Sequence, residues 1–479
     1  MPHLTDQDVE AIARRIAADL QRSAPAAGPQ PTPSTVVRDL GVFATVDEAV
    51  QAAGEAQPIF VALPLAVRAK IIESIRQTML ANNEALARAA HEETGLGRVE
   101  DKVVKNRLVT EKTPGLEELY PHSVTGDHGL TLVEPAPFGV IGAITPCTNP
   151  TSTIICNAIG MVAAGNTVVF NAHPLAKRCS VNTVALLNKA IVAAGGPRNV
   201  VTCLAEPTIE TAQQIMGHPA VRLLVVTGGG AVVRAAMASG KRAICAGPGN
   251  PPVVVDETAN IDKAGRDIVL GASTDNNIIC TDEKEVICVA MVADGLVKAM
   301  TRSGAVLLDR SRLPQLEKAI FAKVNGPRQH AEINKDLIGK NADVILAKIG
   351  MSVPASVRLG IVEVDEDHPL LWTEQMMPIL PVCRVPNADA AIDLAVKVEG
   401  RNRHTAVMHS KNLDNLSRMA KECDCSIFVK NGRSQAGLGL DGEGYCSFTI
   451  ASPTGEGMTG PRSFSRFRRC VLVDHFRIT

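Results

Sequence analysis

Short runs of β-branched and aliphatic residues alternate with helical segments along most of this 479-residue chain. The helical segments are roughly 10–15 residues long, and such alternation builds βαβ units in which helices cover both faces of a parallel sheet. The first group of runs comprises residues 139–145, 167–170, 200–204, 222–226 and 253–255. Beyond residue 250 the alternation is repeated, with runs at 286–289, 380–383 and 426–429. We therefore predict an α/β fold with two domains.

The composition excludes several classes of protein. The chain carries 49 Lys and Arg against 50 Asp and Glu, which argues against a nucleic-acid-binding protein. Its longest apolar stretch, residues 154–170, is interrupted by Asn and Gly and is shorter than the ~20 residues that span a bilayer, so we expect no membrane partner. The 12 cysteines are too few for a disulfide scaffold of this length. We therefore expect a reduced, cytoplasmic compartment.

The sequence offers no convincing metal motif. The 11 histidines are scattered and form no HExxH pattern. The pair Cys423 and Cys425 lacks a second pair of ligands at the spacing that a structural zinc site needs. We therefore expect these cysteines to be structural and the protein to hold no metal.

Residues 1–22 form a separate unit in the sequence. Ile12, Ile16 and Leu20 fall on one apolar stripe of a predicted helix. Residues 23–36 follow as a segment rich in Pro and Ala, which is typical of an extended linker. An amphipathic helix on a linker favours a partner surface for its apolar face. The alternative is a helix that docks on its own domain.

A glycine-rich turn follows one of the predicted strands. Residues 227–230, Thr-Gly-Gly-Gly, lead from the run at 222–226 into a helical pattern that begins at Ala231. Backbone N–H groups at such a helix start form a site for the phosphates of a dinucleotide. A plain structural turn has the same pattern, so the motif alone leaves both interpretations open.

Cys280 is the candidate nucleophile, because it ends a short loop of mixed polarity, residues 275–280. A nucleophilic cysteine acts as a thiolate, which needs partial exposure and nearby N–H dipoles or cations. We expect Asn276, Asn277 and the loop backbone to supply such donors. On spacing alone, an ordinary core thiol remains the alternative. No local Cys–His pair indicates a thiol hydrolase.

Several motifs, in order along the chain, resemble the aldehyde dehydrogenase superfamily. They are residues 137–150, 227–230, 276–280, 373–378 and 447–457. Three further segments are similar to its CoA-acylating branch, in particular the propionaldehyde and acetaldehyde dehydrogenases of microcompartments. These segments are residues 247–258, 428–432 and 468–478. The resemblance covers residues 38–479 and implies a Rossmann-like cofactor domain, a catalytic domain and a β-arm for oligomerisation.

The resemblance assigns roles to individual residues. It makes Cys280 the nucleophile that forms a thiohemiacetal and then an acyl-thioester. The side-chain donor to the oxyanion is Thr148 or Asn149, because strict register places the family's Asn at Thr148, one residue before Asn149. The residues that match the family's cofactor-binding positions are Thr145, Pro146, His173, Pro174, Thr227, Gly228, Gly229 and Glu374.

One departure from the hydrolytic members of the family bears on the product. Those enzymes carry a Glu that activates water, and Ala246 stands in its register here. Without that base, the acyl-enzyme is left to a better nucleophile such as the CoA thiol. The resemblance therefore implies a CoA-acylating aldehyde dehydrogenase that uses NAD and coenzyme A with propionaldehyde or acetaldehyde. A hydrolytic dehydrogenase and a catalytically silent cargo or scaffold protein are the alternatives.

The resemblance also implies a domain plan. Residues 37–247 are expected to form the NAD-binding domain, with a β-arm at about 121–138. The catalytic domain is expected to span residues 248–445. Residues 446–479 are expected to form a C-terminal return segment that ends in an oligomerisation strand. In microcompartment enzymes a helix such as residues 1–22 docks on shell or cargo proteins, which implies the lumen of a bacterial microcompartment.

The oligomer implied by the resemblance is a homodimer or a dimer of dimers. In the family, a β-arm and the C-terminal strand extend the partner's sheet. Here those strands correspond to residues near 130–134 and 468–473.

Overall fold

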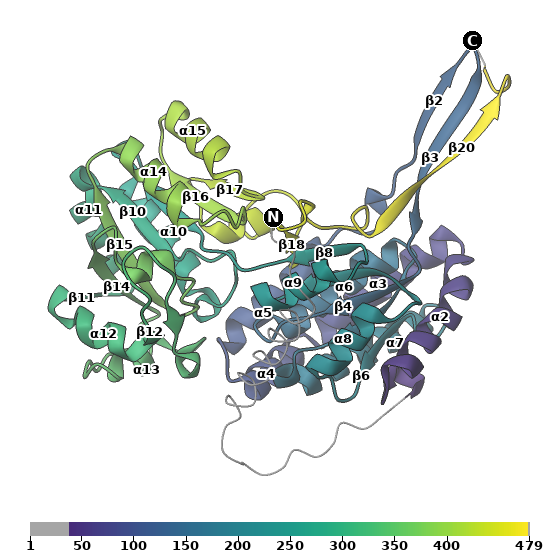
Figure 1. Ribbon diagram of the computed structural model, residues 1–479, viewed down its shortest axis with the longest axis horizontal. Coiled ribbons are helices and arrows are strands. Elements are labelled where there is room, and N and C mark those ends of the chain that lie inside the picture. Colours follow the sequence, from purple (N-terminus) through teal and green to yellow (C-terminus); the bar gives the residue numbers. More distant parts are fainter. Residues whose placement is uncertain (1–37, 478–479) are drawn as a thin grey trace.

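The computed structural model describes residues 38–477. It contains two α/β domains side by side and a long β-arm that projects away from the first of them (Figure 1). The fold class is therefore the α/β class predicted from the sequence. The predicted helix at 1–22 and the linker at 23–36 lie outside the described residues. Within residues 38–477, no helix combines the length and the apolar character that crossing a membrane requires.

The first domain is built on a six-stranded sheet in which every neighbouring pair is parallel. Its strand order is β1-β6-β5-β4-β7-β8. The strands are β1 (Val42–Phe43), β4 (Val140–Ile144), β5 (Thr167–Asn171), β6 (Val201–Leu204), β7 (Val221–Thr227) and β8 (Ala243–Ala246). The central strands are buried along their whole length, because helices cover both faces of the sheet.

The helices of the first domain follow the expected periodicity with one difference. Residues 65–93 carry one continuous helical pattern, but the structure divides them at Asn82 into two helices. The side-chain amide of Asn82 donates to the Thr78 carbonyl, so it satisfies one of the last carbonyls of the first helix. The helices are α2 (Val46–Val61), α3 (Leu65–Ala81), α4 (Asn83–Thr94), α5 (Val99–Lys112), α6 (Pro150–Ala163), α7 (Lys177–Ala193), α8 (Ile209–Gly217) and α9 (Gly230–Ala238).

The order of strands in this sheet creates a switch point between β4 and β7. From β4 the chain moves outward through β5 and β6, and it then crosses back to place β7 on the other side of β4. The two strands end together, since Ile144 pairs with Val226. In open parallel sheets, ligands bind outside the carboxyl ends of the strands at such a point.

The second domain has a seven-stranded parallel sheet of order β11-β14-β15-β10-β9-β16-β17. Its strands are β9 (Pro252–Val255), β10 (Glu285–Val289), β11 (Ala305–Leu308), β14 (Leu359–Val364), β15 (Ile379–Val385), β16 (Thr405–His409) and β17 (Ile427–Lys430). Its helices are α10 (Ile261–Ser273), α11 (Ala290–Arg302), α12 (Leu313–Ile320), α13 (Ala342–Ala347), α14 (Ala388–Val398) and α15 (Leu413–Cys423). Two short antiparallel pairs lie outside both sheets: β12 (Phe321–Lys323) with β13 (Glu332–Ile333), and β18 (Ile450–Ala451) with β19 (Gly457–Met458), of which β18 lies beside β8 of the first domain.

The arm is a three-stranded antiparallel sheet made from two distant parts of the chain. It consists of β2 (His122–Gly126), β3 (Gly129–Pro137) and β20 (Ser465–Val473), with β3 in the middle. Arg468 pairs with Glu134 in this sheet. The two segments that the sequence suggested for extending a partner's sheet thus pair with each other inside one chain.

The chain returns to the first domain before it enters the arm. The hydroxyl groups of Thr449 and Thr227 are 2.9 Å apart. The Nδ2 atom of Asn166, in the turn before β5, donates to the Phe464 carbonyl at 2.9 Å. The first contact places the C-terminal segment at the edge of the sheet where β7 ends, and the second places Phe464 at the opposite edge, where β5 begins.

Candidate active site

The switch point brings together four of the residues predicted to bind the cofactor. Thr145 and Pro146 follow β4 directly, and Thr227 and Gly228 stand at the end of the adjacent strand β7. The hydroxyl of Thr145 is buried and has no hydrogen-bond partner among the described residues. A buried hydroxyl without a partner costs free energy unless a ligand or water pairs with it. This edge of the sheet is therefore prepared for a polar ligand.

The glycine turn fits a phosphate group in part. Gly229 is exposed and is the N-cap of α9, and a Cβ placed on it would meet no atom within 4 Å. The first N–H groups of a helix have no partner within the helix, so those of α9 are available to a phosphate. The N–H of Gly228, in contrast, donates to the Ala246 carbonyl at 3.1 Å. Gly228 therefore has no free N–H for a phosphate, and the amides available to one begin beyond it.

His173 and Pro174 lie at the same edge of the sheet, one strand further out. They follow β5, whose Asn171 pairs with Ile144 of β4. The Nδ1 atom of His173 accepts the Leu175 N–H at 3.2 Å, and burial lowers the pKa of His173. A neutral imidazole and an exposed Pro174 therefore line the approach to the switch point.

Cys280 follows a loop with an unusual backbone. Three consecutive residues have left-handed φ angles, which are 45° at Asp275, 56° at Asn276 and 65° at Asn277. Asp and Asn tolerate this region better than other side chains because their short polar groups form local hydrogen bonds. Three such residues in a row persist only where the surroundings hold them in place. The loop is therefore strained, and specific contacts account for its shape.

Those contacts use the amide groups of both asparagines. The Nδ2 atom of Asn276 donates to the Gly339 carbonyl and to Asn341, each at 2.8 Å. The Nδ2 atom of Asn277 donates to the carbonyls of Ala272 and Glu283 at 2.8 and 2.9 Å. The expectation that these amides serve the Cys280 thiolate is therefore wrong, because their donors are engaged in holding the loop.

Lys284 fastens the same loop from inside. Its side chain is fully buried, and its ammonium donates to the Asn277 backbone and side-chain carbonyls and to the Ile279 carbonyl, at 2.7 to 3.1 Å. Three hydrogen bonds saturate an ammonium group. Lys284 thus fixes the path of the chain immediately before Cys280.

The thiol of Cys280 is half-buried and neutral at rest. Burial and the nearby carboxylate of Glu374 raise its pKa to about 12, although the charge of Lys284 acts in the opposite direction. The thiol packs against the main apolar core. Formation of the thiolate therefore depends on a proton acceptor or on groups that bind to the site.

Gly249, in the segment between β8 and β9, allows three residues from different parts of the chain to lie close together. A Cβ on Gly249 would lie 2.8 Å from the Cys280 carbonyl oxygen and 2.9 Å from Cγ of His404. The N–H of Gly249 donates to the carboxylate of Glu374. Only glycine permits this close approach, so Gly249 allows Cys280, Glu374 and His404 to lie together.

Thr148 and Asn149 stand at the start of α6, with Asn149 as its N-cap. The Oδ1 atom of Asn149 accepts a hydrogen bond from Lys105 Nζ at 2.6 Å, and Nδ2 donates to Thr148 Oγ1 at 3.1 Å. The amide is thus oriented, with its carbonyl held by a cation. Its amide nitrogen remains the group that can donate a second hydrogen bond.

Sequence reasoning missed three residues of this site. Lys105, Lys284 and His404 are buried, yet a charged or polar residue in a sequence is normally taken to be exposed. The Nε2 atom of His404 has no partner among residues 38–477, and burial lowers its pKa to about 4. The sequence does contain one indication that Lys105 belongs to a charged cluster: it lies three residues after Lys102, which places both lysines on one face of α5.

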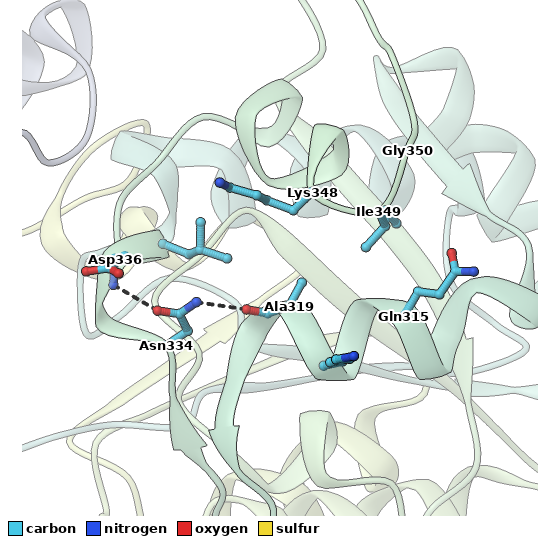
Figure 2. Close-up of a pocket in the computed structure, with 9 residues that line it drawn as sticks. Gln315, Ala319, Asn334, Asp336, Lys348, Ile349 and Gly350 are labelled. Carbon is cyan, nitrogen blue, oxygen red and sulfur yellow. Dashed lines mark hydrogen bonds between the residues drawn. The ribbon is translucent and has the colours of Figure 1, made fainter.

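A surface pocket of about 620 Å³ lies elsewhere in the second domain (Figure 2). It is lined by residues of α12, by residues 334–337 after β13 and by residues 348–350, which follow α13. The amide of Asn334 in its wall is already engaged, since it donates to the Ala319 carbonyl at 2.9 Å and accepts the Asp336 N–H. The lining contains none of the predicted site residues. Across residues 38–477, no cluster of His, Cys, Asp and Glu is placed to hold a metal.

Comparison with known proteins gives close matches over nearly the whole chain. The model of the aldehyde dehydrogenase family matches residues 37–440. An acetaldehyde dehydrogenase (acetylating) of Escherichia coli is 49% identical over 99% of this chain and 100% of its own length. A solved Rhodopseudomonas palustris propionaldehyde dehydrogenase, with bound CoA and an acylated cysteine, has a TM-score of 0.88 and 50% identity, covering 91% of this chain and 98% of that one. A propionaldehyde dehydrogenase from the Clostridium phytofermentans fucose utilisation bacterial microcompartment has a TM-score of 0.89 and 46% identity, covering 92% and 100%.

Proposed function

Because this chain belongs to the aldehyde dehydrogenase family, we propose that it oxidises a short-chain aldehyde with NAD+ and CoA to the acyl-CoA and NADH. Propionaldehyde and acetaldehyde are the substrates that its relatives' names support. The reaction takes place at Cys280, between the two domains. The product is a thioester rather than a free acid.

The observation that carries this proposal is the absence of a water-activating carboxylate at position 246. Ala246 is buried at the end of β8, and its carbonyl is engaged by Gly228. The hydrolytic members of the family have a Glu in this register. An acyl group on Cys280 would therefore react slowly with water and rapidly with a thiol. The acylated cysteine and bound CoA of the Rhodopseudomonas palustris relative support this reading.

The first half of the reaction uses Cys280 and the start of α6. The Cys280 thiolate attacks the aldehyde carbon, and the carbonyl oxygen becomes an alkoxide. The Cys280 N–H and Nδ2 of Asn149 donate to this oxygen, and one such donor is typically worth about 3–4 kcal/mol. We prefer Asn149 to Thr148 as the side-chain donor, because Lys105 fixes the amide through its oxygen and the amide nitrogen keeps a second hydrogen to donate.

The residues at the switch point fit a dinucleotide. Thr145 with its unpaired hydroxyl, Pro146, Thr227 and Gly229 would hold its phosphates, and Glu374 would hold the nicotinamide ribose hydroxyls. When bound, NAD+ supplies the acceptor for the hydride that leaves the former aldehyde carbon. The loss of this hydride leaves an acyl group bonded to the Cys280 sulfur.

The second half of the reaction transfers the acyl group. The CoA thiol attacks the acyl carbon, the bond from that carbon to the Cys280 sulfur breaks, and Cys280 leaves as the thiolate. His404 is neutral at pH 7, and its Nε2 has no partner among the described residues. Because Gly249 lets His404 lie beside Cys280, the imidazole can take the proton of the incoming thiol. His173 and Pro174 line the path of CoA.

Product analysis with and without CoA tests this function. Purified protein incubated with NAD+ and propionaldehyde should form propionyl-CoA and NADH in equal amounts when CoA is present. Cys280→Ala should abolish both products, while Cys470→Ala, which removes an exposed thiol on the arm, should not. Sustained formation of propionate without CoA would instead establish the hydrolytic alternative. If neither product forms, the remaining alternative is a catalytically silent cargo or scaffold protein.

We also propose a homodimer or a dimer of dimers built through the arm. Phe467, Val471 and Val473 of β20 are more than half exposed, at 54%, 56% and 59%. Among the described strands β20 pairs only with β3, so its outer edge offers free backbone groups. Exposed apolar side chains along an unpaired edge favour the addition of another strand.

Finally, we propose that the protein works in the lumen of a cytoplasmic bacterial microcompartment. The apolar stripe of residues 1–22 and the linker at 23–36 support docking on a shell or cargo protein. A relative comes from such a compartment. A protein that lacks residues 1–22 should keep its specific activity and should no longer enter the compartment. A loss of specific activity would indicate that the helix docks on its own domain.

A further inference from the structure

We propose that Lys105 is a positioning residue that locks the oxyanion donor Asn149 to the Cys280 loop across the boundary between the two domains. This inference rests on the proposed function, because it assumes that Cys280 and Asn149 form the reacting centre. It assigns Lys105 no contact with the substrate. Its effect reaches the oxyanion through the amide of Asn149.

The ammonium of Lys105 is shared by both domains. Lys105 lies on α5 of the first domain, and its side chain is only 3% exposed. It donates to Oδ1 of Asn149 at 2.6 Å and to the Thr148 carbonyl at 3.4 Å, both at the start of α6. It also pairs with the carboxylate of Asp275, which belongs to the Cys280 loop of the second domain. One side chain therefore connects the proposed donor to the loop of the nucleophile.

Asp275 is a fixed anchor for this ammonium. It is fully buried, and its Oδ1 atom accepts the Arg98 N–H at 2.7 Å. A Cβ on Gly97 would lie only 1.9 Å from that oxygen, so the chain beside Asp275 has no room for a larger residue. Burial alone would raise the pKa of Asp275, but Lys102 and Lys105 hold it below its usual value. The anchor is thus an ionised carboxylate that cannot move away.

The charge of this cluster favours an anion beside it. Lys102 also pairs with Asp275, at 3.0 Å, so two buried ammonium groups share one carboxylate. The surplus positive charge lies next to the Asn149 amide. A cation that binds the amide oxygen polarises the amide and makes its N–H a stronger donor. Lys105 thus both orients Nδ2 of Asn149 and strengthens its hydrogen bond to the developing oxyanion.

Lys102 provides a matched control, because it differs from Lys105 in one respect. Both lysines lie on α5, both are nearly fully buried, and both pair with Asp275. Of these two lysines, only Lys105 bonds to Asn149 in the part of the chain that the structure describes. Replacement of either lysine by Met removes a buried cation, but only Lys105→Met frees the side-chain amide of Asn149.

The test is a double-mutant cycle with a readout that needs no NAD. Acetyl-CoA is mixed with the protein, and the acetyl group on Cys280 is followed by intact-protein mass spectrometry. This transfer also passes through an oxyanion: the new bond joins the acetyl carbon to the Cys280 sulfur, and CoA leaves as the thiol. We expect Asn149→Ala to slow the step by about 100-fold and Lys105→Met by about tenfold.

Coupling distinguishes positioning from a purely structural role. In the Asn149→Ala background, Lys105→Met should cost less than about twofold, because the donor that it orients is gone. Lys102→Met should cost the same factor in both backgrounds. If Lys105→Met costs tenfold in both backgrounds, or nothing in either, the inference is wrong.

A pH profile gives a second readout. Burial and the charge of Lys102 lower the pKa of Lys105 to about 8, while Asp275 and, less strongly, Asp282 raise it. The wild-type rate is divided by the Lys105→Met rate at each pH, because the titration of Cys280 affects both rates and drops out of the ratio. This ratio should fall as the pH rises through about 8, where Lys105 loses its charge. Lys102→Met should shift this fall to higher pH. A ratio that is constant from pH 6 to 10 would contradict the inference.

Lys105→Arg keeps the test decisive if Lys105→Met does not fold. Arginine does not titrate below pH 12, so the fall above pH 8 should disappear while a charged donor remains. Persistence of the fall in this variant would overturn the inference. A wild-type protein that is not acylated at Cys280 would overturn the proposed function instead, so the two failures are distinguishable.

Discussion

The ammonium of Lys284 donates to both oxygen atoms of Asn277, the backbone carbonyl at 2.8 Å and the side-chain carbonyl at 2.7 Å. Asn277 is the last of three residues with left-handed φ angles before Cys280. A single buried cation therefore holds the strained end of the loop that presents the nucleophile, and its charge also favours the thiolate.

Lys284→Met should weaken both the fold and the nucleophile. The change leaves buried carbonyls and carboxylates without their cation, which typically costs about 3–5 kcal/mol in the free energy of unfolding. It should also slow alkylation of Cys280 by iodoacetamide, because the charge of Lys284 lowers the pKa of the thiol. Urea unfolding and the alkylation rate measure the two effects.

Lys112→Met is the control for this prediction. Lys112 also donates to two backbone carbonyls, those of Gly439 and Gly442, but it does not contribute to the pKa of Cys280. Its replacement should reduce stability and leave the alkylation rate of Cys280 unchanged. Equal alkylation rates in Lys284→Met and the wild type would contradict the role assigned to Lys284.

Glu374→Gln should change reactivity and activity in opposite directions. After burial, the charge of Glu374 is the strongest influence that raises the pKa of Cys280, so its removal should increase the alkylation rate of the free protein at pH 9 several-fold. NADH formation should fall, because the proposed contact with the ribose hydroxyls is lost. Glu257→Gln, at an exposed carboxylate, should leave both rates unchanged. A decrease in alkylation would show that Glu374 does not act on the thiol.

The stability of the protein should depend on Glu283 between pH 4.5 and 7. Glu283 is fully buried and accepts hydrogen bonds from the Ser434 N–H and hydroxyl at 2.7 and 2.9 Å, and burial raises its pKa from 4.5 to about 7. The native state therefore binds a proton that the unfolded state has released, and this contribution to stability is lost as the pH rises through 7. A full shift corresponds to about 3 kcal/mol.

Glu283→Gln carries no titrating proton at this site, so it isolates the contribution. Relative to the wild type, its free energy of unfolding should increase by up to about 3 kcal/mol between pH 4.5 and 8. Urea unfolding at several pH values measures the difference. Glu443→Gln, at an exposed carboxylate, should give a profile parallel to the wild type. A parallel profile for Glu283→Gln would mean that its folded-state pKa is near 4.5.

The proposed oligomer should depend on the exposed apolar residues of β20. Val471→Lys combined with Val473→Lys places charges along the free edge, which disfavours the addition of a further strand. Size-exclusion chromatography with light scattering should show a lower mass than for the wild type. Leu413→Lys, at an even more exposed apolar residue off the arm, should keep the wild-type mass. An unchanged mass in the double variant would exclude this edge as the interface.

The sequence predicts the strands near the site well because these strands are short, apolar and rich in β-branched residues. The run at 139–145 contains β4, and the run at 222–226 lies within β7. Helical periodicity alone could not predict the division of residues 65–93 at Asn82, because the apolar stripe continues across it. Nor could the pattern show that the N–H of Gly228 is engaged by Ala246, which depends on the pairing of β7 with β8.

The ionic framework of the site was not predictable from local patterns. Lys105 and Asp275 are 170 positions apart, and their pairing depends on how the two domains meet. In a sequence, a lysine on a helix is most simply placed in solvent. The resemblance of short motifs identified Cys280 as the nucleophile, but the left-handed loop that presents it and the cations that hold that loop required the structure.

The most direct test of the account is the fate of the acyl group when CoA is withheld. The protein is incubated with NAD+ and propionaldehyde alone, and intact-protein and peptide mass spectrometry follow the propionyl adduct. The account predicts one propionyl group per chain on Cys280, a single turnover of NADH, and release of the group as propionyl-CoA when CoA is added. Continued NADH formation with accumulation of propionate, or an adduct on another residue, would contradict it.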